Sequence, residues 1–319
     1  MSKLDYRIGS FNLKNFGYSS EKDFDKIAQI IIDEGLDVVA LQEILSEGRG
    51  VKRYLEQCIR YDLYDWDFCW ALPQESSDSE KIADMIRGDK RGEGYAYLWN
   101  KKKFKLAEMS VLGKERKFEP RIINSLSTDV HVDCSVFLRA PYYIRLQPLH
   151  GGFFELRLIN IHIYFGDTTL NSIAKRKVEY GILTEEIYPS LSTKRYGNFR
   201  AAYTVAMGDY NLNIFTPGVK AGNNSINPIH LYNEGEKTIH VITDQYELST
   251  LKLPDNSNKE KLNRYANNYD HFTFSPEISK FNKVSFETID AVNKYCNGDF
   301  EYYYKKISDH IPIVMTIDI

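Results

Sequence analysis

The sequence predicts an α/β fold in which strands of the parallel type alternate with helices. An apolar run over 37–43 follows an amphipathic segment over 20–34, which is typical of a helix that leads into a buried strand. An alternating strand over 153–162, a helical segment over 170–187 and an apolar strand over 202–208 then follow one another. A helix placed between two strands in this way indicates a crossover connection in an α/β sheet.

Length and composition agree with a folded enzyme. The 319 residues allow two domains or one large two-sheet α/β domain, and 43% of them are apolar. The 23 Tyr and 17 Phe favour strands. A formal charge of −3 provides no basic field for nucleic acid. Positive charge at a phosphate site would therefore come from a metal ion and a few Arg or Lys side chains.

The cysteines and the N-terminus bear on the compartment. Cys58, Cys69, Cys134 and Cys296 show no metal-type spacing and fall in or near apolar stretches, so we read them as reduced core thiols. The first seven residues contain no apolar leader, and no later run could span a bilayer. We expect a soluble cytoplasmic protein without an integral membrane segment, or a secreted one if a leader was trimmed.

The first strands end in polar side chains. A strand over 7–13 ends near Asn12, and the buried strand over 37–43 ends at Glu43. A carboxylate at the C-terminal end of such a strand lies where α/β folds bind ligands. A strand over 93–100 begins at Glu93, between two glycines that permit close backbone approach.

The connections between these strands are less regular. A second helix is expected over 50–61, and the polar residues 73–92 indicate a surface insertion. The crossover helix over 170–187 should end there, because Pro189 lies just past it. Residues 212–268 carry the signals of long loops.

The second half adds further polar residues at strand ends. Arg139 lies near the end of a β-rich run and is a natural partner for a phosphate or carboxylate. His162 ends an alternating strand, where it becomes a candidate acid or base. Asp209 and Asn211 are two residues apart, so they leave the same face of an extended segment. Asp270 opens another strand.

The last strand, over 311–317, directly follows Asp309 and His310. A carboxylate at this point can hold a hard divalent cation, and the adjacent imidazole can take a proton from water. Taken alone, this motif is also an ordinary loop before a strand.

Together these residues form a set with one chemistry. They supply oxygen ligands for Mg²⁺, two imidazoles for proton transfer and acids to orient them, which are the parts of a metal-assisted phosphoester hydrolase. The set consists of Asn12, Glu43, Glu93, Arg139, His162, Asp209, Asn211, Asp270, Asp309 and His310.

The ordered motifs resemble the endonuclease/exonuclease/phosphatase superfamily, and within it deoxyribonuclease I and the bacterial membrane nucleases of the mycoplasma type. The motifs include Ser-Phe-Asn12-Leu, Leu-Gln-Glu43, Asn-Ile-His162, Gly-Asp209-Tyr-Asn211 and Ser-Asp309-His310-x-Pro. They extend from residue 8 to 317, which argues for a single domain over 1–319. The resemblance implies a four-layer α/β/β/α sandwich of two packed mixed β-sheets flanked by helices, with the site at one rim.

The resemblance also implies roles. Glu43 would be the chief ligand of Mg²⁺ or Mn²⁺, helped by Asn12 and Asp309, with Ca²⁺ as a supporting ion. His310, oriented by Asp270, looks like the general base that activates water.

The remaining roles concern the phosphate. His162, paired with Glu93, resembles the partner that protonates the leaving oxygen or stabilises the phosphorane. Asp209 and Asn211 would hold the phosphate, the attacking water or a second metal.

Substrate contacts are expected from Arg139, Asn211 and Tyr95. His271 departs from the pattern, because deoxyribonuclease I-like sequences often carry Arg after the acid. The implied activity is metal-dependent hydrolysis of DNA by His-activated water, as an endonuclease of low sequence specificity, with RNA as an alternative substrate.

Two rival functions stay open at this point. One is a phosphodiesterase or phosphatase of the same fold that acts on phospholipid head groups or inositol phosphates. Tyr302, Tyr303 and Tyr304 would then form an aromatic membrane contact, although a buried or packed Tyr cluster is the preferred explanation. The other is a non-catalytic binding module.

Overall fold

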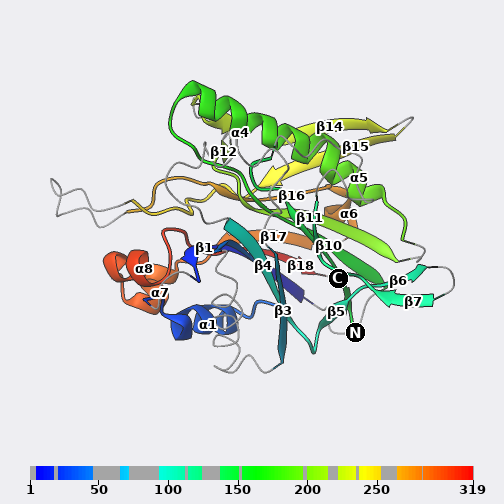
Figure 1. The fold of residues 1–319 in the computed structure, drawn as a ribbon, viewed down its shortest axis with the longest axis horizontal. Helices are drawn as coiled ribbons and strands as arrows, with labels where there is room; N and C mark the ends of the chain where they lie inside the picture. The colour runs from blue at the N-terminus through cyan, green and yellow to red at the C-terminus, as the bar shows by residue number, and fades with distance from the viewer. Residues whose placement is uncertain are drawn as a thin grey trace.

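Two mixed β-sheets pack face to face in the computed structural model, and helices cover their outer sides (Figure 1). The predicted four-layer sandwich is therefore confirmed. The structure describes residues 5–17, 21–45, 65–71, 93–111, 114–123, 137–150, 153–196, 200–214, 222–234, 237–252, 264–281 and 283–318.

The first sheet contains the N-terminal and C-terminal strands side by side. β1 and β2 are parallel and are joined by α1 (Phe24–Asp33), whereas the other pairings are antiparallel. The strand order is β17 (Lys283–Thr288), β18 (Ile313–Asp318), β1 (Asp5–Phe16), β2 (Val38–Leu45), β4 (Glu93–Asn100) and β3 (Trp66–Ala71).

The second sheet repeats this plan. β10 and β11 are parallel and are joined by α4 (Leu170–Ile182), as the crossover pattern predicts. The order is β14 (Ile229–Glu234), β15 (Lys237–Asp244), β16 (Asp270–Phe274), β11 (Ala201–Asp209), β10 (Phe154–His162), β9 (Tyr142–Pro148) and β5 (Phe104–Leu106), with β8 (Arg121–Ile122) also on β9.

Smaller elements complete the described chain. Two short strand pairs join β6 (Glu108–Val111) to β7 (Lys114–Lys117) and β12 (Asn213–Ile214) to β13 (Ser225–Ile226). The other helices are α5 (Tyr188–Thr193), α6 (Glu277–Phe281), α7 (Ala291–Cys296) and α8 (Phe300–Lys306).

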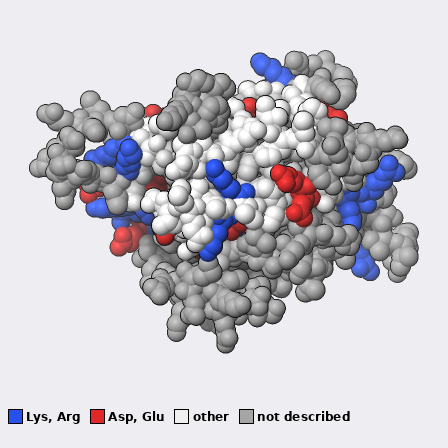
Figure 2. All heavy atoms as spheres, turned by 90° about the horizontal axis from the view of Figure 1, so that it is seen from above, with Lys and Arg blue, Asp and Glu red and all other residues white. Residues whose placement is uncertain are grey.

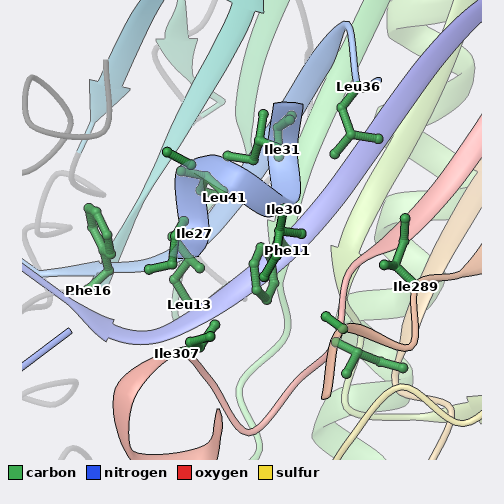
Figure 3. Close-up of a cluster of buried hydrophobic side chains, with 14 of the residues drawn as sticks. Phe11, Leu13, Phe16, Ile27, Ile30, Ile31, Leu36, Leu41, Ile289 and Ile307 are labelled. Carbon is green, nitrogen blue, oxygen red and sulfur yellow. The ribbon is translucent and has the colours of Figure 1, made fainter. Parts of the chain in front are cut away.

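Helix α1 shows how the sequence builds an outer layer. The Asp23 carboxylate accepts a hydrogen bond from the Lys26 amide and so caps the helix, and Gly35 adopts φ +60° just after its end. Each buried Ile contributes roughly 1.5–3 kcal/mol to folding. The cluster that α1 forms with the first sheet includes Ile27, Ile30, Ile31, Phe11 and Leu13 (Figure 3).

The faces that the two sheets turn toward each other change from apolar to polar at one rim. On β10, Leu156 and Leu158 belong to the core between the sheets. Asn160 and His162 continue that face, because side chains alternate along a strand. On the neighbouring β11, the same alternation places Asp209 on the face that lies toward the core. The polar strand ends of the sequence therefore meet at this rim.

A buried polar network joins the sheets directly below the rim. The Gln42 side-chain amide donates to Asn160 Oδ1 at 2.7 Å and to Ser10 Oγ at 3.1 Å. The Asn160 side-chain amide donates to the carbonyl oxygens of Leu41 at 2.9 Å and Ala96 at 3.2 Å. Because buried amides are costly unless they are paired, this network favours one spacing of the two sheets.

The crossover segment is longer than predicted. A π-helical turn (Leu183–Ile187) connects α4 to α5, so the predicted helix end at Ile187 is wrong. The π turn changes the hydrogen-bond register, and Pro189 falls in the first turn of α5, where its missing N–H costs little.

The stretch over 212–268 also differs from the expectation of long loops. Its described part contains β12 to β15, and the β14–β15 hairpin forms one edge of the second sheet. The helix expected over 50–61 lies outside the described residues, as does the whole insertion at 73–92.

Two other expectations concern cysteines and membranes. Cys69 and Cys296 are free thiols, as predicted, whereas Cys58 and Cys134 lie outside the described residues. Within the described ranges, we find no helix of the length and apolarity that a membrane crossing requires.

Gly208 permits the close approach of β10 and β11. It has φ +147°, and a Cβ atom there would lie 1.8 Å from the Ile161 carbonyl oxygen. We expect Gly208→Ala to lower the free energy of unfolding by more than the roughly 1–3 kcal/mol that backbone strain alone costs. Thermal unfolding measures this loss.

Gly181→Ala is the matched control, because apart from the backbone of helix α4 itself no atom of the described residues lies within 4 Å of the added Cβ. It should be neutral or stabilise the protein by roughly 0.5–1 kcal/mol. An unchanged melting temperature for Gly208→Ala would show that the two strands do not need this glycine.

Candidate active site

A cavity of about 300 Å³ opens at the polar rim between the two sheets. Most of its lining was predicted from the sequence. The lining residues are Glu43, Glu93, Arg139, His162, Tyr164, Phe165, Gly166, Asp209, Asn211, Asp309 and His310.

Strand register brings three of the predicted residues together on the second sheet. His162 at the end of β10 lies opposite Asp209 on β11, and Asp209 lies opposite Asp270 on β16. Direct cross-strand neighbours have Cβ atoms roughly 4.5–5.5 Å apart. The sheet therefore aligns an imidazole and two carboxyl groups.

A backbone irregularity turns Glu43 toward the cavity. The pairing of β2 with β4 shifts register between Gln42 and Ile44, so Glu43 is the extra residue of a bulge, and its φ is +58°. Its carboxylate accepts hydrogen bonds from the Asn12 side chain at 3.0 Å and the Asn15 amide at 2.9 Å. Bulges that re-aim a side chain in this way are common at active sites.

Asn12 lies beneath the cavity wall and is fully buried. Its Nδ2 donates to Glu43 Oε1 at 3.0 Å and to Asp209 Oδ2 at 3.1 Å. Its Oδ1 accepts the Lys14 amide at 2.9 Å. Asn12 therefore joins the two carboxylates from below, and its direct ligation of a metal stays a prediction.

Asp309 extends from the segment before the last strand. Its Oδ2 lies 3.1 Å from the Lys14 ammonium. Its Oδ1 is buried without a hydrogen-bond partner among the described residues. This oxygen is available for a cation inside the cavity.

The Lys22 ammonium fixes the two chain segments behind these carboxylates. It donates to the carbonyl oxygens of Leu13 at 2.8 Å and Ile307 at 2.7 Å. Burial lowers the pKa of Lys22 to about 8, although Asp309 and Glu43 act in the opposite direction. The contacts tie the end of β1 to the loop that carries Asp309.

The donor set fits a hard divalent cation. No group of three or more His, Cys, Asp or Glu side chains in the described ranges is arranged to enclose a metal. Mg²⁺ does not require one, since it usually takes one or two carboxylates and fills its other positions with water and substrate phosphate. Glu43 and Asp309 meet that requirement on the wall of one cavity.

His310 and Asp270 form the closest imidazole–carboxylate pair in the site. His310 Nδ1 lies 2.8 Å from Asp270 Oδ2, and the Ser249 hydroxyl donates to the same oxygen at 2.6 Å. Burial alone would lower the pKa of His310, but Asp270 and Asp209 raise it well above its usual value. The pair therefore fixes the ring and makes it basic.

Asp209 lies between the two imidazoles. Its Oδ2 is 3.6 Å from His310 Nε2 and 3.5 Å from His162 Nε2. Burial raises the pKa of Asp209 to about 7, while the nearby His310 lowers it. The Asn211 amide donates to Asp209 Oδ1 at 2.8 Å, and Asn211 has φ +51°. A strained backbone thus presents Asn211 to the cavity.

His162 is held as a neutral imidazole. Burial, Arg139 and His310 all lower the pKa of His162 well below its usual value. The expected partner Glu93 has its Oε2 3.5 Å from His162 Nδ1 and also forms an ion pair with Arg139. Arg139 Nη1 is buried without a hydrogen-bond partner among the described residues, and the residue lines the cavity.

Tyr95 is a correction to the predicted substrate contacts. Its side chain is fully buried, and its hydroxyl donates to the Arg139 carbonyl at 3.1 Å while accepting the His162 amide at 3.2 Å. Both hydrogen-bonding capacities are used inside the protein, so Tyr95 supports these two residues and is not among those that line the cavity.

His271, the departure noted in the sequence, is also internal. Its ring nitrogens lie 3.1 Å from the Gln245 carbonyl and 2.8 Å from the Leu212 carbonyl, on the face of β16 opposite Asp270. It joins neighbouring segments and lies outside the cavity lining.

The sequence interpretation missed two buried charges, Arg176 and Glu179 on helix α4. A signal for Arg176 exists, because it occupies the helix stripe formed by Ile173 and Tyr180. Charged residues on a buried stripe are rare unless they are paired.

Comparison with known proteins gives a likeness to solved structures. No protein-family model matches the chain, and neither does any curated protein sequence. The structure of D. rerio TDP2 with a single-strand DNA product is 14% identical, with a TM-score of 0.53 over 99% of both chains. ANGEL2, a 2′,3′-cyclic phosphatase, is 12% identical, with a TM-score of 0.55 over 100% of this chain and 97% of the other.

A third match carries the fold's family name. An endonuclease/exonuclease/phosphatase family protein from Bacteroides thetaiotaomicron is 12% identical, with a TM-score of 0.52 over 100% of this chain and 99% of the other. The chain has the endonuclease/exonuclease/phosphatase fold. The resemblance seen in the motifs is thereby confirmed at the level of the fold.

Proposed function

We propose that this chain is a single-domain, divalent-metal-dependent phosphodiester hydrolase that acts as a nuclease on DNA. The observation that carries the proposal is the His310–Asp270 pair, which opens onto the same cavity as the carboxylates of Glu43 and Asp309. The matched structures support this chemistry, since one contains a single-strand DNA product and another is a cyclic phosphatase.

The residues suggest a hydrolytic step with water as nucleophile. The substrate phosphate contacts Arg139 and Asn211, and His310 Nε2 takes a proton from the attacking water. The water oxygen bonds to phosphorus as the bond to the leaving oxygen breaks. A Mg²⁺ ion bound by Glu43 and Asp309 would offset the negative charge that develops on the phosphate and the leaving oxygen.

His162 is better suited to stabilising charge on the phosphate than to donating a proton to the leaving oxygen. Because its pKa lies well below the usual value, the ring is neutral near pH 7 and holds no proton to release as imidazolium. A neutral ring can donate one N–H hydrogen bond to a phosphate oxygen. Of the two roles that the resemblance implies, this one agrees with a neutral ring.

The charge distribution agrees with local recognition of phosphate. On the face shown in Figure 2, the Lys and Arg side chains of the described residues form small groups among acidic and uncharged ones. At the cavity itself, positive charge for a substrate phosphate would come from Arg139, which lines it, and from the metal ion.

The aromatic triplet gives little support to a lipid substrate. Tyr303 is buried, the Tyr302 hydroxyl bonds to Asp23, and the Lys14 ammonium lies 3.4 Å from the centre of the Tyr304 ring. All three side chains make contacts within the protein. We therefore place nucleic acid before phospholipid head groups, and the inositol phosphates are left to direct assay.

A substrate panel tests this order. Purified protein with Mg²⁺ or Mn²⁺ is given supercoiled plasmid, single-stranded DNA, RNA, inositol phosphates and phospholipid vesicles. We expect cleaved DNA with 5′-phosphate and 3′-hydroxyl ends. Release of phosphate from inositol phosphates with intact DNA would keep the catalytic residues and overturn the nuclease assignment.

The pH profile tests the role of Asp270. His310 acts as a base only when it is unprotonated, so activity is present above its pKa and is lost as pH falls through it. Asp270→Asn removes a charge that raises the pKa of His310. We expect the rising limb of kcat against pH to move to lower pH, while kcat falls roughly 10²–10⁴-fold because the ring loses its orientation. An unmoved limb would contradict this pairing.

A further inference from the structure

Helix α4 presents two charged side chains to the protein interior. Arg176 is 2% exposed and Glu179 is 5% exposed. Burying such groups is expensive unless they make hydrogen bonds. Their contacts lead to three segments of the cavity wall, none of which belongs to α4.

Arg176 joins two of these segments. Its Nη1 donates to the Asn211 carbonyl at 2.9 Å, and its Nη2 donates to the Asp167 carbonyl at 2.7 Å. Its guanidinium also lies 4.6 Å from the centre of the Phe165 ring, which lines the cavity. Arg176 thus holds the strained Asn211 backbone against the rim segment over 164–167.

Glu179 joins the third segment to the rim. Its Oε1 accepts the Leu138 amide at 3.4 Å, and its carboxylate also accepts the Tyr164 amide. Leu138 precedes Arg139, and Tyr164 lines the cavity. Burial raises the pKa of Glu179 to about 7, although these amides lower it.

The segment around Arg139 is not held by the backbone hydrogen bonds of a strand or helix. Residues 137–140 belong to no strand or helix, so β-ladder bonds do not set the position of Arg139. The Tyr95 hydroxyl fixes the Arg139 carbonyl from the first sheet, and Glu179 fixes the preceding amide from α4. Two layers of the sandwich therefore converge on one substrate-binding residue.

We propose that Arg176 and Glu179 are positioning residues, through which helix α4 places Asn211 and Arg139 for contact with the substrate phosphate. The inference rests on the proposed function of the cavity. Neither residue is among those that line it, so each would act through its partner and touch no substrate.

A double-mutant cycle separates positioning from stability. Glu179→Leu removes the acceptor for the Leu138 amide, and we expect kcat/KM for an oligonucleotide to fall roughly 10- to 100-fold, as small misplacements cost in enzymes. In an Arg139→Ala background the same change should have little further effect, since coupled residues are not additive. Equal losses in both backgrounds would overturn the proposal for Glu179.

Conservative variants check the mechanism of this effect. Glu179→Gln keeps an oxygen acceptor in the same place and should restore activity close to that of the wild type. Arg176→Met, combined with Asn211→Ala, provides the corresponding cycle for the other residue. Failure of Glu179→Gln to rescue a correctly folded protein would show that these hydrogen bonds do not carry the effect, and it would overturn the positioning role of Glu179.

Arg157→Lys is the matched control. Arg157 is a buried residue of β10 that donates to the carbonyl oxygens of Leu191 and Ser192, away from the cavity lining. We expect it to lower the melting temperature and leave kcat/KM of the folded protein unchanged. A loss of kcat/KM as large as that of Glu179→Leu would contradict a role specific to α4.

A binding measurement keeps this test distinct from the test of function. Fluorescence anisotropy with a labelled single-stranded oligonucleotide in EDTA needs no turnover. If the wild type binds the oligonucleotide but hydrolyses no phosphodiester, the nuclease assignment fails. The positioning role of Glu179 would still be supported if Glu179→Leu lowered the oligonucleotide affinity only in proteins that retain Arg139. Equal oligonucleotide affinity for the wild type and Glu179→Leu, together with equal kcat/KM, would overturn it.

Discussion

Replacing His310 with Ala is expected to reduce kcat for DNA hydrolysis roughly 10²–10⁴-fold, the usual contribution of a general base. The imidazole is held at 2.8 Å from Asp270, and no other group at the cavity combines that orientation with a raised imidazole pKa within the described residues. Steady-state kinetics on a defined oligonucleotide measures the loss, and KM should change little.

His240→Ala is the control for this substitution. His240 is an exposed residue of β15 and does not line the cavity, so activity should stay at the wild-type level. If His310→Ala retained full kcat with unchanged metal dependence, water activation would have to be assigned to another group.

Replacing Glu43 with Gln should weaken metal binding and activity together. The change keeps the size of the side chain and removes the charge that would hold the cation. Because a bound metal contributes several kcal/mol of charge stabilisation, we expect a roughly 10²–10³-fold loss of kcat/KM at low Mg²⁺. Isothermal titration calorimetry with Mn²⁺ provides a readout that does not depend on catalysis.

The control is a carboxylate outside the site. Glu287 on β17 pairs with Arg7 at 2.7 Å and does not line the cavity, so Glu287→Gln should bind Mn²⁺ like the wild type. Equal Mn²⁺ affinity for the wild type and Glu43→Gln would exclude Glu43 as the chief ligand.

Much of the candidate site could be predicted because strand alternation is local. Polar residues that follow apolar ones on the same face of a strand are visible in sequence, as for His162 after Leu158 and for Asp209 after Met207. Strands of one sheet share an edge, so these ends meet once the fold is known. The register between strands, which sets Asp209 beside His162 and Asp270, cannot be predicted from such a local pattern.

The features that the sequence did not predict depend on contacts between distant segments of the chain. Tyr95 alternates correctly, but its hydroxyl reaches the opposite sheet and is used there, which the pattern of one strand cannot show. The bulge at Glu43 depends on pairing with two neighbouring strands. Arg176 looks like a surface charge until the loops that its guanidinium contacts are in place.

The predicted helix end at Ile187 was wrong for a related reason. Pro189 normally marks a stop, but a π turn resets the hydrogen-bond pattern before it. Packing of α5 against β11, where the Tyr188 hydroxyl bonds to the Thr204 carbonyl at 2.9 Å, accompanies that turn.

Nicking of supercoiled plasmid tests the central claim most directly. Purified wild-type protein and His310→Ala are incubated side by side with Mg²⁺, with Mn²⁺ or with EDTA. We predict nicked and linear DNA from the wild type only when a metal is present, and intact plasmid from the variant. Intact plasmid from the wild type under every condition, or nicking that persists in His310→Ala, would contradict a metal-dependent nuclease that uses this histidine.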